Sequence, residues 1–131
     1  MVLQCISNVP AVAYSDYQVD LGFAVDSSSR IPVGMWNNIL NYAKAVIDSF
    51  DISSSRTRVG FIVFSNYARI AFPFDADYTR AGVKQMIDGM QQSDSAEQRI
   101  DRALQVAYRD LFSARYGART GARQVKRPSL S

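Results

Sequence analysis

The most constraining feature of the sequence is the segment 19–25, VDLGFAV, an almost unbroken apolar run that leads into the polar loop 26–29, DSSS. Such a run predicts a strand covered on both faces, as in a parallel sheet packed between helices. Pro32 follows the loop, where the first turn of a helix tolerates proline. Over residues 33–50, apolar side chains recur at gaps of one, three and four, which predicts an amphipathic helix.

The remaining pattern completes one α/β layer structure. Residues 58–64 (RVGFIVF) and 68–72 (ARIAF) predict two strands, and the three residues between them predict an antiparallel hairpin. Helical spacing returns over residues 79–90, with Thr79 or Asp77 as the cap, and over residues 100–114, with Gly117 at the exit. The order strand, helix, strand, strand, helix, helix predicts a Rossmann-like fold, and nothing after Gly117 reads as a further strand.

The positive net charge is concentrated at the end of the chain. Residues 1–112 contain ten basic and twelve acidic residues, whereas residues 113–131 contain five basic residues and no acid. We expect residues 118–131 to form a basic, flexible tail that is solvated and frayed. The alternative is a tail that binds nucleic acid or an anionic membrane surface. Its absence of aromatic or amphipathic patterning favours the first interpretation, so no nucleic-acid partner is expected.

The composition argues against catalysis. Histidine is absent and Cys5 is the only cysteine, which removes the commonest general base and any internal disulfide. The first predicted strand leads into DSSSR rather than a glycine-rich phosphate loop. We therefore expect a protein that is not an enzyme. Residues 1–16 lack the basic start of a secretion signal and are expected to be a linker, and no segment is long and apolar enough to span a membrane.

Three segments in the right order resemble the von Willebrand factor A family. VDLGFAVDSSSRIP resembles its first strand and loop, RVGFIVFSNYARIAFPF its second and third strands, and QRIDRALQVAYRDLFSARYGAR a later helix of the family. Within this family, the three segments are most similar to the modules of matrilins and fibril-associated collagens. This resemblance implies a partial domain over residues 17–117, a Rossmann-like fold truncated before its fourth strand. It also implies an extracellular protein-interaction module whose partner is a matrix protein or collagen.

The resemblance implies a magnesium-type site as well, and this sequence departs from it. The family's first loop supplies an aspartate and two serines at intervals of two residues; Asp26 and Ser28 match, but the third place holds Arg30. Gln98 stands where the second loop offers threonine, and the third loop, threonine-aspartate-glycine, has no counterpart. A guanidinium repels a cation. We therefore expect a remnant site that holds neither Mg²⁺ nor Ca²⁺, where Asp26 and the serines cap the next helix or Arg30 folds over Asp26.

The resemblance also predicts what the chain lacks. In the family the first strand is flanked by the second and fourth strands, so one edge of residues 19–25 is expected to be unpaired and open to self-association. Many members carry a cysteine before the first strand that pairs with one after the last helix. Cys5 is then an orphan, either inert or available for an intermolecular disulfide. A non-functional truncated product of the family is the remaining alternative.

Overall fold

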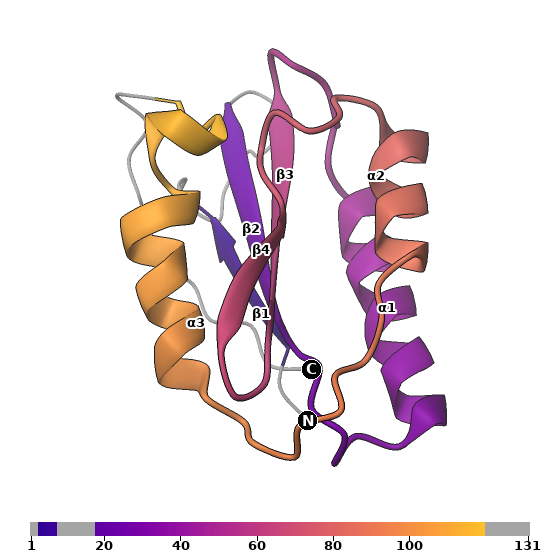
Figure 1. The fold of residues 1–131 in the computed structure, drawn as a ribbon. Helices are drawn as coiled ribbons and strands as arrows, with labels where there is room; N and C mark the ends of the chain where they lie inside the picture. The colour runs from indigo at the N-terminus through magenta and orange to yellow at the C-terminus, as the bar shows by residue number, and fades with distance from the viewer. Residues whose placement is uncertain (1–2, 8–17, 120–131) are drawn as a thin grey trace.

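The computed structural model describes residues 3–7 and 18–119, which form one sheet with helices on both sides (Figure 1). Every strand and helix predicted from the sequence is present. In chain order the elements are β1 (Leu3–Ser7), β2 (Val19–Asp26), α1 (Val33–Asp48), β3 (Thr57–Phe64), β4 (Ala68–Phe72), α2 (Arg80–Asp88) and α3 (Ile100–Val106), followed by a π-helical turn (Ala107–Leu111) and a 3₁₀ turn (Ala114–Tyr116).

The sheet has the strand order β1-β2-β3-β4. β2 and β3 are parallel, with Val19 opposite Thr57 and Asp26 opposite Phe64. β3 and β4 form the expected antiparallel hairpin. The crossover between the parallel strands is α1, so the predicted Rossmann-like α/β arrangement is confirmed.

Two apolar cores lie on the two faces of the sheet, because successive residues of a strand point to opposite faces. Odd-numbered residues of β2 and β3 pack with α1 and α2, and even-numbered ones pack with α3 and the π-helical turn. Figure 1 shows α1 and α2 together on one side of the sheet and α3 on the other. Both central strands are buried almost throughout, as the apolar run 19–25 predicted.

A column of phenylalanine rings joins three strands on the face covered by α1 and α2. Phe23, Phe61 and Phe72 stack in sequence, with 5.5 Å between neighbouring ring centroids and interplanar angles of 21° and 27°. Stacked aromatic pairs contribute about 0.5–1.5 kcal/mol each beyond their buried area. The column therefore fixes the relative position of β2, β3 and β4.

On the face of the sheet that α3 covers, large side chains pack directly against two glycines of the central strands, Gly22 and Gly60. A Cβ at Gly60 would lie 2.9 Å from a methyl carbon of Leu111 and 3.1 Å from the Phe74 ring, and one at Gly22 would lie 3.1 Å from the Phe112 ring. The π-helical turn places Leu111 and Phe112 over Gly60 and Gly22, which together form a glycine strip on this face. The two glycines are what allow the turn to approach the sheet so closely.

Strand β1 corrects two expectations. Its residues fall within the segment 1–16 expected to be a linker, and they pair antiparallel with β2, Leu3 opposite Val25 and Ser7 opposite Leu21. The edge of residues 19–25 is therefore not open, and the prediction of self-association through that edge is wrong. Sequence reasoning required the partner strand to come later in the chain, whereas a short segment from the beginning supplies it. Cys5 lies in β1 opposite Phe23.

The segment expected to be a flexible tail begins with an ordered contact. Asp20, only 1% exposed, accepts hydrogen bonds from the backbone N–H of Arg119 at 2.8 Å and from its Nε at 2.8 Å. The Arg119 Nη2 also donates to the Val19 carbonyl at 2.6 Å. Arg119 thus neutralises a buried carboxylate at the start of β2 and is not a solvated charge. The expectations for Arg123, Lys126 and Arg127 lie outside the described residues.

Replacing Gly60 by alanine tests the close approach of the π-helical turn. G60A should lower the free energy of unfolding by about 1–3 kcal/mol, since the added methyl must displace Leu111 and Phe74 in a packed core. The matched control is G34A, because a Cβ at Gly34 meets nothing within 4 Å. It should leave stability unchanged or raise it by up to about 1 kcal/mol. Equal effects of the two substitutions in guanidinium unfolding would contradict this packing.

Candidate functional site

The candidate site lies where three segments meet at the carboxyl ends of β2 and β3. Asp26 ends β2 and leads into Ser27 and Ser28, and Ser65 follows β3. The loop 91–99, between α2 and α3, lies against both. Because parallel strands end at the same edge of a sheet, residues far apart in sequence come together there. Asp26 and Ser28 are 1% and 0% exposed.

Gln98 and the backbone of the first loop hold the Asp26 carboxylate. Its Oδ1 accepts a hydrogen bond from the Ser28 N–H at 2.8 Å, and its Oδ2 accepts one from the Gln98 Nε2 at 2.6 Å. A buried carboxylate is costly unless it accepts such bonds. The structure therefore brings together Asp26, Ser28 and Gln98, three of the four loop residues singled out from the sequence.

Both roles expected for this loop in the absence of a cation are wrong. Helix α1 has Pro32 as its N-cap and no capping side chain, so Asp26 and the serines do not cap it. Arg30 is exposed and forms none of the ion pairs found among residues 18–119. The loop 26–29 ends before the N-cap position of α1, and the Asp26 carboxylate accepts its hydrogen bonds from the Ser28 N–H and the Gln98 amide.

Further hydrogen bonds tie the loop 91–99 to the first loop. The Ser93 N–H donates to the Ser27 carbonyl at 2.7 Å, and the Ser29 N–H donates to the Ser95 carbonyl at 2.8 Å. The Gln92 side chain donates to the carbonyls of Ser28 and Ile31. Backbone and side-chain bonds thus fix the two loops to each other along their length.

The same loop is also fixed to the turn after β3. The Arg99 N–H donates to the Ser65 carbonyl at 2.8 Å, and the Ser65 and Ser93 hydroxyls are 3.0 Å apart in a hydrogen bond. The Arg99 guanidinium donates a hydrogen bond to Asp101 and not to the loops. This hydrogen bond lowers the pKa of the Asp101 carboxyl to about 2. Arg99 therefore contributes its backbone, and not its charge, to the contact between these loops.

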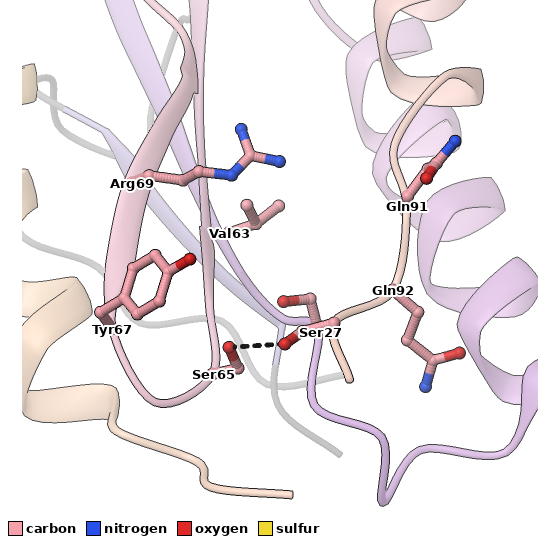
Figure 2. Close-up of a pocket in the computed structure, with 8 residues that line it drawn as sticks. Ser27, Val63, Ser65, Tyr67, Arg69, Gln91 and Gln92 are labelled. Carbon is pink, nitrogen blue, oxygen red and sulfur yellow. Dashed lines mark hydrogen bonds between the residues drawn. The ribbon is translucent and has the colours of Figure 1, made fainter. Parts of the chain in front are cut away.

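A polar cavity of about 210 Å³ opens beside these loops. Figure 2 shows one wall formed by β4, which carries Arg69, and by Tyr67 in the turn before it. The segment that carries Gln91 forms the other wall, and the Gln92 amide points away from Arg69. The cavity is lined by Ser27, Val63, Ser65, Tyr67, Arg69, Gln91, Gln92 and Ser93.

Comparison with models of protein families identifies the family of this chain. The model for the von Willebrand factor type A domain matches residues 20–126. The chain belongs to this family. Mouse von Willebrand factor A domain-containing protein 2 is 38% identical over 55% of this chain and 9% of its own length. Human matrilin-4 is 30% identical over 86% of this chain and 18% of its own length.

Other matches extend the comparison to adhesion and thread proteins. The transmembrane cell adhesion receptor mua-3 of Caenorhabditis elegans is 29% identical over 86% of this chain and 3% of its own length. Solved structures of proximal thread matrix protein 1 from the mussel byssus share the fold. In one of them zinc occupies the metal-binding motif of that protein, called MIDAS. The first has a TM-score of 0.71 at 22% identity and covers 76% of this chain and 27% of that chain. The present chain spans less than a fifth of the curated relatives it matches.

The donor set of this von Willebrand factor A domain fits a hard divalent cation poorly. Such an ion takes about six oxygen ligands. Here the Gln98 amide donates N–H to the very carboxylate that a cation would need, and Arg30 stands at the third place of the first loop. One observation points the other way: the buried Ser28 Oγ has no hydrogen-bond partner among residues 3–7 and 18–119. A single hydroxyl and one carboxylate do not make an octahedral site.

Sequence reasoning did not identify several residues of this region. The sequence indicates only a hairpin around Ser65, Tyr67 and Arg69, and no motif in it marks Gln92 or Ser93. A pair of glutamines at the end of a helix carries no recognisable motif. The only signal was the density of serine and glutamine over residues 91–98, which is equally typical of a solvated loop.

Replacing Gln98 by methionine tests its role as the partner of Asp26. Q98M removes one of two donors from a buried carboxylate, so the free energy of unfolding should fall by about 1–3 kcal/mol. The matched control is Q105M on the exposed side of α3, which should change it by less than about 0.5 kcal/mol. The measurement is urea unfolding in EDTA, and indistinguishable midpoints would show that the Gln98 contact contributes nothing.

Proposed function

We propose that this domain is a non-enzymatic protein-interaction module of extracellular-matrix type that binds its partner without a metal ion. Family membership supports the interaction role, since its relatives include matrilin-4 and a cell adhesion receptor. The sequence offers no histidine for acid–base work. Within residues 3–7 and 18–119 no helix is long and apolar enough to cross a bilayer.

The observation that carries metal independence is the hydrogen bond from Gln98 to Asp26. A cation between loops neutralises a carboxylate and cross-links segments that are distant in sequence. In this domain the Gln98 amide reaches Asp26 across 72 positions of the chain at 2.6 Å, and backbone bonds join the same loops. The binding surface is therefore organised by hydrogen bonds, which persist when divalent ions are removed.

The Ser28 hydroxyl is compatible with this proposal. An unsatisfied buried hydroxyl costs about 1–3 kcal/mol. That cost does not create affinity for Mg²⁺, which gives up its water reluctantly and requires near-ideal geometry. Ser28 and Asp26 alone would leave most of the coordination shell to water.

Calorimetric titration with MgCl₂ and MnCl₂ tests the metal question directly. We expect no saturable heat and no shift in melting temperature at millimolar concentrations of either ion, because the donor set is incomplete. Binding tighter than about 1 mM that disappears in the variant D26N would overturn metal independence.

Binding to immobilised matrix proteins tests the interaction role. A panel that includes fibrillar collagen and a matrilin should yield at least one saturable partner, with equal affinity in EDTA and in MgCl₂. A heat-denatured sample of the same domain serves as the control for non-specific adsorption. Saturation that requires MgCl₂ would contradict metal independence, and the absence of any saturable partner would contradict the matrix assignment.

A further inference from the structure

Among the described residues that line the 210 Å³ cavity, Arg69 is the one that carries a charge. It comes from β4, the edge strand of the described sheet, and its side chain is exposed. Within residues 18–119 its guanidinium takes part in no described ion pair or side-chain hydrogen bond. Arg99, at the end of the neighbouring loop, pairs with Asp101. Arg30 in the first loop is also exposed and outside the described ion pairs, but it is not among the described residues that line this cavity.

The other described lining residues are polar apart from Val63, and none of them is acidic. Tyr67, Gln91, Ser65 and Ser93 border the cavity together with the apolar side chain of Val63. Figure 2 shows the Arg69 side chain extending from β4 toward the wall that carries Gln91. An adjoining cavity between β4 and the end of α2 shares Arg69 and Gln91, and its other lining residues are Ala71, Phe72, Met86, Gly89 and Met90. Arg69 is therefore not neutralised from that side either.

Size and charge limit what can bind. Pockets that hold drug-sized molecules measure about 300–1,000 Å³, so the polar cavity of about 210 Å³ suits a single side chain. The adjoining cavity is larger, about 410 Å³, but apart from Arg69 and Gln91 its described lining is apolar or glycine and adds no charge. One guanidinium matches the charge of one carboxylate and can bind both of its oxygens in a planar, two-point contact. A phosphate dianion would leave a charge unmatched by this lining.

We propose that the cavity is a carboxylate site, in which Arg69 binds an aspartate or glutamate side chain of a partner protein. Tyr67 and Gln91 supply additional hydrogen-bond donors at the rim. This inference rests on the proposed function, because it names the chemistry by which a metal-free interaction module recognises its partner. It assigns the positive charge of the binding surface to an exposed side chain carried by the edge strand β4.

The test uses the peptide acetyl-Gly-Asp-Gly-amide as the probe, titrated into isotope-labelled domain in EDTA at constant ionic strength. Amide NMR shifts should saturate at Arg69, Gln91 and Ser93, with a dissociation constant on the order of 10 mM, as befits a single exposed ion pair. The asparagine version of the peptide should cause no saturable shift.

Two variants locate the binding charge. R69Q should weaken binding at least tenfold while leaving the melting temperature unchanged, because the side chain is exposed. R69K should give an intermediate affinity, since lysine keeps the charge but loses the two-point contact. The matched control R30Q, which removes another exposed arginine from the same loop region, should bind as tightly as the native domain.

Four outcomes would overturn the proposal: absence of saturable shifts, equal shifts with the asparagine peptide, unchanged affinity in R69Q, or equal loss in R30Q. Each of them leaves the proposed function standing if a matrix partner still binds in EDTA. Peptide binding that appears only with added Mg²⁺ and maps to Ser28 and Gln98 would instead refute metal independence. The two failures are thereby distinguishable.

Discussion

The parallel pairing of β2 with β3 is the constraint on which the rest of the structure depends. These two strands are buried on both faces, and they carry both cores: the phenylalanine column of Phe23, Phe61 and Phe72 on one side and the glycine strip under Leu111 on the other. Because the strands are parallel, their carboxyl ends share one edge of the sheet. Asp26 and Ser65 thus become neighbours of the loop 91–99 as a direct consequence of the central pairing.

The elements that form the central pairing were predictable from the sequence, because each has a periodic pattern within one short segment. The run 19–25, the helical stripe over 33–50 and the hairpin 58–72 each have a period that one short segment reveals, and even the cap at Thr79 was readable. β1 was not readable, because a five-residue strand that contains Gln4 and Ser7 carries too weak a pattern. Its pairing with β2 depends on a contact between distant segments. The buried Asp20 with Arg119, separated by 99 positions, was missed for the same reason.

In the candidate site, too, the sequence predicts which residues are present but not the contacts they make. Asp26, Ser28 and Gln98 could be named from sequence, because a family pattern marks those positions. What they do could not: the pattern predicts which residues occupy the place of ligands, whereas the geometry shows the Gln98 N–H donating to Asp26. An amide can accept from a donor or donate to an acceptor, and only the position of its neighbour decides which. Arg30 illustrates the reverse case, a charged residue at the expected place whose side chain is exposed and pairs with no described acid.

Rigidity connects the lost cation site with the cavity beside it. Gln98, Gln92 and Ser93 hold the loop 91–99 against the first loop, so one wall of the cavity is fixed, while Arg69 stands on a strand whose position the phenylalanine column sets. A binding group that is held in place before its partner arrives loses less conformational entropy on association. Hydrogen bonds at the carboxyl ends of the strands therefore do more than replace a charge at Asp26: they also fix the loop that follows Gln91 in the wall opposite β4.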